Sequence, residues 1–204
     1  MNVFGHPLST CTRKVITTLT ELGLPYELTV VDFAKGEHKQ PPHLARQPFG
    51  QIPTIEDAGF ELYESRAICR YLNEKAGGAL VPAGLQGRAE MERWVSVETS
   101  NFTPAAMKFI YHHVFKRAQD DAVLATARTG LDAALRIMND RLGEVPYLAG
   151  DAFSIADIGY MPYVEYLMAS PVKEVIATHP HVMAWWGRVS ERPSWQRASG
   201  RAAA

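Results

Sequence analysis

Two short features in the N-terminal half constrain the fold of this chain most: a proline before one apolar run and an acidic residue with a serine before another. Pro53 follows Ile52 and precedes apolar residues of the segment 54–55. A proline there lacks a backbone donor where a strand would begin, and its peptide bond is a candidate for the cis form. Glu64 and Ser65 precede an apolar helical pattern and would cap its N-terminus. The first N–H groups of such a helix are free and suit a carboxylate. Each feature alone is also typical of an ordinary strand or helix start.

The surrounding residues predict a small α/β unit with a β-α-β start, a hairpin and a closing helix. Apolar residues at helical spacing stop at Gly23, between two strand-like segments. The predicted elements are a strand at 3–4, a helix that ends at Gly23, a strand over 26–31, a hairpin of 54–56 and 60–62 around the turn 57–59, and a helix capped by Ser65 that ends at Gly77-Gly78.

The second half of the chain carries helical patterns and no convincing pair of strands, so it predicts an all-helical domain. Residues 82–87 are predicted to be the linker. A long helix that includes Trp94 is expected to bend in the region of Pro104. Apolar spacing over residues 131–142 predicts another helix. Residues 154–157 have the spacing of a capping box with aspartate as its acidic member, and their expected role is folding.

Composition and charge are those of a soluble enzyme. The 204 residues are 47% hydrophobic, enough to bury a core in one or two domains. The formal net charge of −1 gives no general field for nucleic acid or an anionic membrane. The sequence starts without a basic and apolar leader pattern, and no uninterrupted apolar run approaches about 18 residues. With Cys11 and Cys69 as the only cysteines, a reducing compartment is the simpler interpretation, and we expect a cytoplasmic protein without nucleic-acid or membrane partners.

Four segments together carry a family resemblance. They are VFGHPLSTCTR over 3–13, KGEHK over 35–39, QPFGQIP over 47–53 and YESRAI over 63–68. In this order they resemble the glutathione site of the cytosolic glutathione transferases, and of the phi class in particular, and the resemblance covers nearly the whole chain. It implies a thioredoxin-like glutathione-binding domain over 1–80 and an all-helical domain over 88–204 that contributes the electrophile site. It also implies a homodimer that uses glutathione as co-substrate. No metal is expected, because His112 and His113 are consecutive and face different directions on a helix, and His179 and His181 lack a ligand set.

The activity that the resemblance implies is conjugation of the glutathione thiolate to hydrophobic electrophiles, with peroxide reduction as a possible second activity. A free thiol has a pKa of about 8.5, and only the thiolate attacks well. Ser9 stands where the first strand gives way to the first helix, and its match to the motif makes it the leading candidate for the hydroxyl that stabilises the thiolate. On local evidence alone, an N-cap is the more common role for Ser9. Thr10 and Thr12 are neighbouring donors.

Cys11 supports a competing enzyme hypothesis. A cysteine in the first turn of a helix, near Arg13 and Lys14, has reason to ionise. Related transferases with a catalytic cysteine carry out mixed-disulfide chemistry, so a Cys11-dependent glutathione thiol-disulfide reductase is one alternative. Because Cys11 follows Ser9 by two positions, it is expected to point about 200° away around the helix. A ligand-binding carrier is the non-enzyme alternative, and Cys69 is expected to pack in the core.

The resemblance assigns two groups of contacts to the glycine and cysteinyl parts of glutathione. His38 and Lys39 match the loop motif and would bind the glycine carboxylate; a solvated charged loop is the alternative. Gln51 and Ile52 would offer main-chain groups to the cysteinyl unit, next to Pro53.

A third group of contacts concerns the γ-glutamyl unit. Glu64 would accept from its ammonium group. The hydroxyl and N–H of Ser65 would hold its carboxylate. Arg66 is expected to support the fold or the dimer edge.

The electrophile site is expected to be apolar. Leu8, Phe33, Tyr111 and Phe115 are predicted to line it, and Tyr166 is a weaker candidate. Tyr111 and Phe115 are four residues apart and share a helix face. An aromatic pair at this spacing is more often plain core, so the assignment depends on the resemblance.

Overall fold

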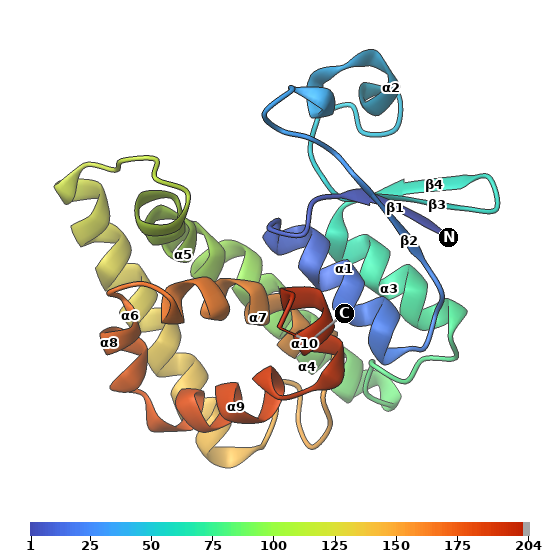
Figure 1. Ribbon diagram of the computed structural model, residues 1–204. Helices are drawn as coiled ribbons and strands as arrows, with labels where there is room; N and C mark the ends of the chain where they lie inside the picture. Colours follow the sequence, from blue (N-terminus) through green and yellow to red (C-terminus); the bar gives the residue numbers. More distant parts are fainter. Residues whose placement is uncertain (202–204) are drawn as a thin grey trace. The chain divides into compact units, whose positions relative to one another are not determined.

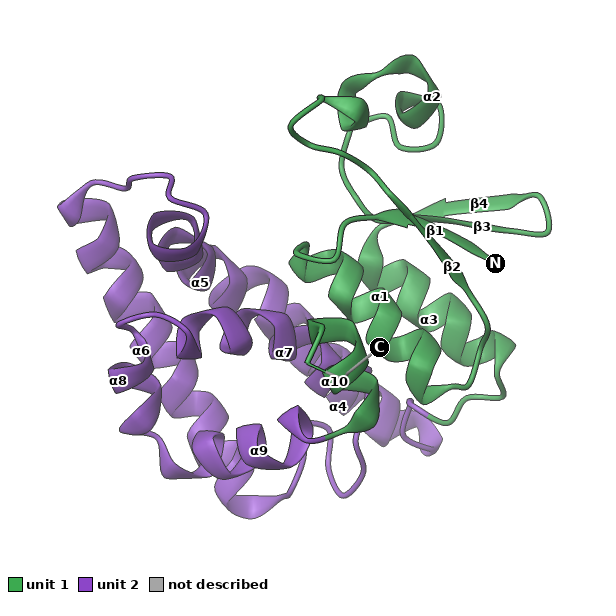
Figure 2. Ribbon diagram, viewed as in Figure 1, with its two compact units in different colours: residues 1–79, 192–204 green, residues 80–191 purple. Residues whose placement is uncertain are grey.

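The computed structural model describes residues 1–201, which fall into two units (Figure 1, Figure 2). Unit 1 contains residues 1–79 together with the chain from Arg192 onward, and unit 2 contains residues 80–191. The sequence predicted a domain over 1–80 and another over 88–204. The two divisions therefore differ over the segment that begins at Arg192.

Unit 1 is built on a four-stranded sheet in the order β2-β1-β3-β4. The strands are β1 (Asn2–Gly5), β2 (Glu27–Val30), β3 (Thr54–Asp57) and β4 (Phe60–Tyr63). Strand β1 runs parallel to β2 and antiparallel to β3, with Val3 opposite both Leu28 and Ile55. The β3–β4 turn at Ala58-Gly59 has positive φ at both residues, which a two-residue hairpin turn of this kind requires. The predicted strands and hairpin are confirmed.

Over the described residues, unit 1 also contains five helical segments. They are α1 (Thr10–Glu21), the short 3-10 helix η1 (Glu37–Lys39), α2 (Pro41–Leu44), α3 (Ser65–Lys75) and α10 (Pro193–Ser199). Helices α1 and α3 lie side by side against one face (Figure 1), and α1 buries Val15 and Leu19 completely. On the opposite face, the guanidinium of Arg46 lies 4.3 Å from the centre of the Phe4 ring. The β1–α1 connection that carries Ser9 is thus fixed between a central strand and a buried helix.

An ion pair attaches the C-terminal segment to α1. Arg192 donates through Nε and Nη2 to the two carboxylate oxygens of Glu21, each at 2.7 Å, and the Ser194 hydroxyl also donates to Glu21. Trp195 in α10 is fully buried. This pairing joins residues far apart in the sequence, so local patterns could not predict it. Helical periodicity alone placed the segment in the second domain.

Unit 2 is helical apart from an isolated bridge between Tyr147 and Gly150. Its helices are α4 (Gly84–Val97), α5 (Thr103–Phe109), α6 (Asp121–Glu144), α7 (Ile155–Met168), α8 (Lys173–Ala177) and α9 (Pro180–Ser190), with the π-helical segments η2 (Glu98–Phe102) and η3 (Ile110–Val114). The predicted linker over 82–87 is too long, because α4 already begins at Gly84. The irregularity expected near Pro104 is present as η2, directly before α5.

Asp157 organises the interior of unit 2 and confirms the predicted capping box. Its carboxylate accepts hydrogen bonds from the Ser154 N–H and the Leu148 N–H, both at 3.0 Å, and from Trp185 Nε1 at 2.9 Å. Burial raises the pKa of Asp157, and these hydrogen bonds oppose that rise. Among the helices within residues 1–201, none has the length and apolar character needed to cross a membrane.

Candidate active site

Ser9 lies at the N-terminus of α1, where its side chain is half-buried. Its backbone is extended (φ −75°, ψ 126°), and its Oγ accepts a hydrogen bond from the Thr12 N–H at 3.2 Å. The Ser9 N–H donates to the His6 carbonyl and the Ser9 carbonyl accepts from the Arg13 N–H, both at 2.9 Å. The N-cap role is therefore present. It is compatible with a second role, because a hydroxyl that accepts from a helix still has an O–H to donate to another group.

The neighbours of Ser9 differ in what they can offer a ligand. Thr12 is buried, and its Oγ1 accepts from the His6 N–H at 3.2 Å, so its hydroxyl serves the β1–α1 connection. Cys11 is free and half-buried in the first turn of α1. Cys69 packs in the core as predicted: burial raises the pKa of its thiol to about 11, and Thr18 donates to its sulfur at 3.2 Å. Cys11 is therefore the cysteine of the two that solvent reaches.

His38 and Lys39 lie in η1, beside Phe33. The rings of Phe33 and His38 are stacked with centres 4.2 Å apart. Within the described chain, Nδ1 of His38 is buried without a hydrogen-bond partner. Burial, followed by the charges of Lys39 and His43, holds the pKa of His38 below its ordinary value, so the ring is neutral at neutral pH. Lys39 Nζ donates to the carbonyl of Phe49 at 2.8 Å, which fixes the ammonium group on this loop.

Two buried polar side chains hold the loop before β3. His43 Nε2 lies 2.7 Å from the Gln51 main-chain oxygen, and Gln47 Oε1 accepts from the Gln51 N–H at 3.2 Å. Both main-chain groups of Gln51 are thus engaged, which favours Ile52 as the residue that offers main-chain groups to a ligand. The Ile52–Pro53 peptide bond is cis, as predicted. Gln47 stood in a matched motif but was not assigned a role, and nothing in the sequence set His43 apart.

The start of α3 differs from the prediction that Ser65 caps it. The N-cap is Glu64, whose φ of 70° turns the chain so that Ser65 becomes the first helical residue. A positive φ at a residue other than glycine is uncommon and is found often at functional sites. Ser65 is 3% exposed, and its hydroxyl makes no hydrogen bond to any other part of residues 1–201. The hydroxyl of Ser65 and the first N–H groups of α3 therefore lie together beside the exposed side chain of Glu64.

Three of the residues predicted to line the electrophile site form one aromatic cluster in unit 2. The ring centres of Tyr111 and Phe115 are 6.2 Å apart, and those of Phe115 and Tyr166 are 5.6 Å apart in an edge-to-face arrangement. Tyr111 and Phe115 are half-buried, whereas Tyr166 is buried. In unit 1, Leu8 and Phe33 are 52% and 45% exposed. Large apolar side chains at this exposure are available for contact with a ligand.

Family models match most of the chain. The glutathione S-transferase N-terminal domain matches residues 1–74, and the C-terminal domain of the same family matches residues 102–193. Glutathione S-transferase F7 of Arabidopsis thaliana is 36% identical over 201 residues, which cover 95% of this chain and 96% of that protein.

Solved structures are equally similar. Glutathione transferase F2 from Populus trichocarpa superposes with a TM-score of 0.93 at 35% identity, covering 98% of this chain and 97% of the other. Glutathione S-transferase I from mais, in complex with an atrazine glutathione conjugate, has a TM-score of 0.91 at 33% identity, covering 100% of this chain and 99% of the other.

The chain belongs to the glutathione S-transferase family. The predicted family, its phi-class character and the thioredoxin-like and all-helical domains are confirmed, and the predicted glutathione transferase function agrees with these relatives. Over residues 1–201, no three or more His, Cys, Asp or Glu side chains gather in a way that could hold a metal ion.

Proposed function

We propose that unit 1 binds glutathione, that the Ser9 hydroxyl stabilises its thiolate, and that the sulfur then attacks an apolar electrophile. The position of Ser9 carries the proposal. Its Oγ is held by the Thr12 N–H at the N-terminus of α1, so the O–H is available to donate to a sulfur that binds next to this helix end. A hydrogen bond to the anion and the positive end of the helix both favour the thiolate over the thiol.

The magnitudes are sufficient. Lowering a thiol pKa by about two units requires about 2.7 kcal/mol. A hydrogen bond to a charged group contributes about 1.5 to 3 kcal/mol, and a helix N-terminus contributes about 0.3 to 1 kcal/mol. Together these two effects keep much of the bound glutathione ionised near neutral pH. With a haloaromatic substrate, the sulfur–carbon bond forms, the carbon–halogen bond breaks, and the halide leaves; the thiol proton is released when the thiolate forms.

The γ-glutamyl unit is proposed to bind at the start of α3. The hydroxyl of Ser65, which makes no hydrogen bond within the described chain, and the first N–H groups of the helix suit its carboxylate. The exposed carboxylate of Glu64 suits its ammonium group.

The rest of glutathione is proposed to follow the loops before β3. Main-chain groups of Ile52 suit the cysteinyl unit, with Pro53 beside them, while Gln51 supports the loop through His43 and Gln47. The glycine carboxylate is assigned to His38 and Lys39. Because the pKa of His38 is lowered, its ring would act as a neutral donor, and Lys39 would supply the charge.

In unit 2, the cluster of Tyr111, Phe115 and Tyr166 supplies an apolar surface for the electrophile. Tyr111 and Phe115 are only half-buried, which favours a contact surface over closed core packing. Within unit 1, the exposed side chains of Leu8 and Phe33 are proposed to contact the same class of ligand.

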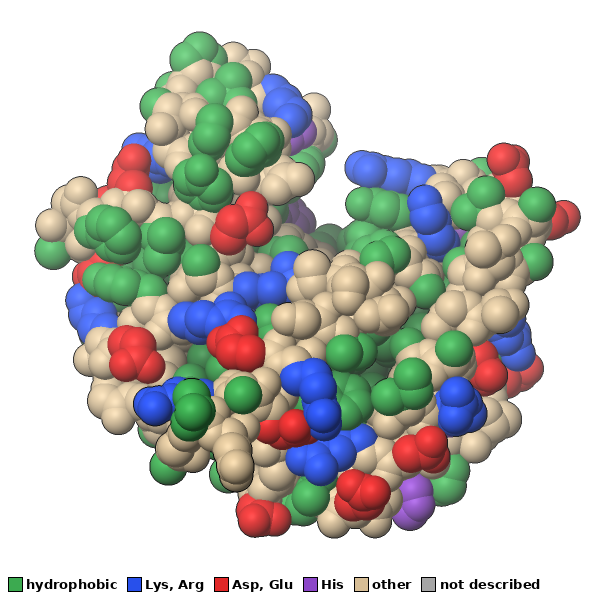
Figure 3. All heavy atoms as spheres, turned by 180° about the vertical axis from the view of Figure 1, so that it is seen from behind, with side chains coloured by type: hydrophobic (Ala, Val, Ile, Leu, Met, Phe, Trp, Pro, Cys, Tyr) green, Lys and Arg blue, Asp and Glu red, His purple; other side chains and the backbone are tan. Residues whose placement is uncertain are grey.

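We propose that the protein is a cytoplasmic homodimer. Phe49 is 65% exposed at the end of the loop that Lys39 holds, and its ring contacts Tyr63 edge-to-face. Apolar side chains gather on the part of unit 1 that carries α2 (Figure 3). A large aromatic ring exposed among apolar neighbours is typical of an anchor at a protein interface.

Conjugation assays on two variants test the proposal against the reductase alternative. Ser9→Ala is expected to reduce conjugation of a haloaromatic by about 10- to 1,000-fold, the usual cost of removing one donor to an anion. Cys11→Ala is expected to stay within a few-fold of the unmodified chain, because the attacking sulfur belongs to the ligand. Loss of activity in Cys11→Ala alone, together with a glutathione adduct on Cys11 by mass spectrometry, would favour the reductase.

A further inference from the structure

Arg117 lies at the exposed edge of the aromatic cluster in unit 2. Its guanidinium carbon is 5.5 Å from the centre of the Tyr111 ring, and the centre of the Phe115 ring is 6.2 Å from the same point. The half-buried Tyr111 ring thus has a cation on one side and a second aromatic ring beside it. A guanidinium that stacks on a ring still has N–H groups at its edge to donate to a ligand.

The main chain fixes the position of residue 117. The Arg117 N–H donates to the Tyr111 carbonyl at 2.8 Å, and Lys116 has a positive φ of 54°. A left-handed residue directly after the last helical residue is a common helix end. The Gln119 side chain donates to the Arg117 carbonyl at 3.1 Å. These contacts use only main-chain groups of residue 117, so they hold its side chain beside the aromatic cluster whichever residue stands there.

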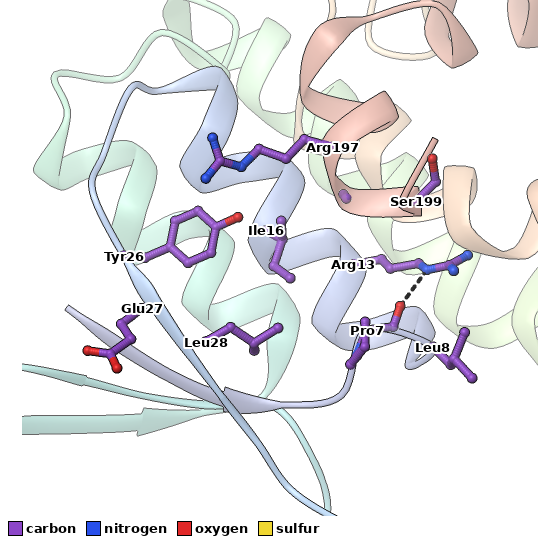
Figure 4. Close-up of a pocket in the computed structure, with 11 residues that line it drawn as sticks. Pro7, Leu8, Arg13, Ile16, Tyr26, Glu27, Leu28, Arg197 and Ser199 are labelled. Atoms are coloured by element: carbon purple, nitrogen blue, oxygen red, sulfur yellow. Dashed lines mark hydrogen bonds between the residues drawn. The ribbon is translucent and has the colours of Figure 1, made fainter. Parts of the chain in front are cut away.

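The charge of Arg117 is available to a ligand. Arg13 in unit 1 shows the opposite arrangement: its side chain is buried, and its Nε donates to the Pro7 carbonyl at 2.8 Å (Figure 4). Arg117 is exposed, and it forms no ion pair with a carboxylate of residues 1–201. An acidic group that reaches this edge of the cluster therefore displaces no partner from Arg117.

The neighbouring charged groups leave this edge cationic. Lys116 is exposed, and its Nζ donates to the His113 carbonyl at 2.8 Å. Burial, followed by the charges of His112 and Lys116, holds the pKa of His113 below its ordinary value, so this ring is neutral at neutral pH. The aspartates 120–121 stand at the N-terminus of α6, where the positive end of the helix favours them. Neither aspartate pairs with Arg117.

We propose that Arg117 is a specificity-determining residue that selects electrophiles carrying a carboxylate or sulfonate. The inference rests on the proposed function and names the class of electrophile. The ring of the electrophile packs on Tyr111 and Phe115, and its acidic group pairs with Arg117. This charge-assisted hydrogen bond is one that a neutral electrophile of the same shape lacks. The reaction itself is unchanged: the glutathione sulfur bonds to the ring carbon and the halide leaves, while the acidic group takes no part in bond making.

A matched pair of haloaromatics tests the preference: 4-chloro-3,5-dinitrobenzoate and 4-chloro-3,5-dinitrobenzamide. They have similar shapes and the same leaving chloride, but only the benzoate is charged. Each kcat/KM is divided by the rate constant of the uncatalysed reaction with glutathione, which removes the difference in intrinsic reactivity. The quotient is expected to be about 5- to 20-fold higher for the benzoate. Equal quotients would overturn the inference and leave the proposed function standing, whereas no conjugation of either compound would refute both.

Variants assign the preference to Arg117. Arg117→Gln is expected to lower kcat/KM for the benzoate by about 5- to 20-fold and to leave the benzamide within about 2-fold, and Arg117→Lys should recover part of the loss. Arg128→Gln makes the same change of charge at an exposed position of α6 and should leave both compounds unaffected. Added salt should narrow the difference between the two compounds in the unmodified chain. A loss of equal size for both compounds in a folded Arg117→Gln variant would make Arg117 a support for the Tyr111 ring and overturn the inference.

Discussion

Replacing Ser65 by alanine separates ligand binding from folding. The Ser65 side chain is 3% exposed, and its hydroxyl makes no hydrogen bond to another residue of the described chain. Its removal therefore breaks no hydrogen bond within the described chain, and the free energy of unfolding is expected to change by less than about 0.5 kcal/mol. In the complex, the same hydroxyl is assigned to the γ-glutamyl carboxylate. Losing a hydrogen bond to a charged group costs about 1 to 3 kcal/mol, which is about 5- to 150-fold in Kd.

Calorimetric titration with glutathione measures this loss, and thermal unfolding measures the stability of the same samples. Ser96→Ala is the matched control, because it removes an exposed hydroxyl from α4 in unit 2. It is expected to bind glutathione like the unmodified chain. Unchanged affinity in a folded Ser65→Ala variant would mean that the carboxylate binds elsewhere.

Three further predictions concern stability, specificity and assembly. Burial opposes the charge of Glu21, but hydrogen bonds from Arg192 and Ser194 outweigh it and hold the pKa of Glu21 below its ordinary value. The resulting stabilisation is present above the unfolded-state pKa, about 4.3, and is lost as pH falls through the folded-state pKa. Glu21→Gln should therefore lower the free energy of unfolding by about 1 to 3 kcal/mol near neutral pH. Thermal unfolding should show that the difference between the variant and the unmodified chain shrinks at acidic pH, and a difference that does not depend on pH would contradict this. Tyr111→Ala should change the ratio of kcat/KM between electrophiles while glutathione affinity stays constant, whereas a loss of stability alone would make Tyr111 a core residue. Phe49→Asp should lower the mass measured by light scattering from about twice the 22.6 kDa chain mass toward the mass of one chain. An unchanged dimer would exclude Phe49 as an interface anchor.

The sequence predicted the parts of the fold that depend on local pattern. Helical periodicity located α1 and α6, strand-like residues located the hairpin, and the spacing of Ser154 and Asp157 identified a capping box that the structure contains. Pro53 directly before an apolar run indicated the cis peptide bond. In each case the residues that decide the structure lie within a few positions of one another.

Features that depend on distant contacts or on backbone geometry could not be predicted. The pairing of Glu21 with Arg192 spans 171 positions, so no local pattern assigned α10 to the same unit as α1. The positive φ of Glu64 shifted the cap from Ser65 by one residue. The use of the Gln51 main chain by His43 and Gln47 depends on the folded loop. Of the two residues predicted to offer main-chain groups, Gln51 and Ile52, it therefore leaves Ile52 as the one proposed here.

The pKa of the bound glutathione thiol tests the central role of Ser9 most directly. Thiolate absorbance of the complex, followed across pH, should give a thiol pKa about two units below the free value of about 8.5. In Ser9→Ala, that pKa should rise by about one to two units, because the sulfur loses its hydroxyl donor while the helix N-terminus remains. Cys11→Ala should leave it unchanged. A Ser9→Ala complex that binds glutathione and titrates at the same pH as the unmodified complex would contradict the assignment of Ser9.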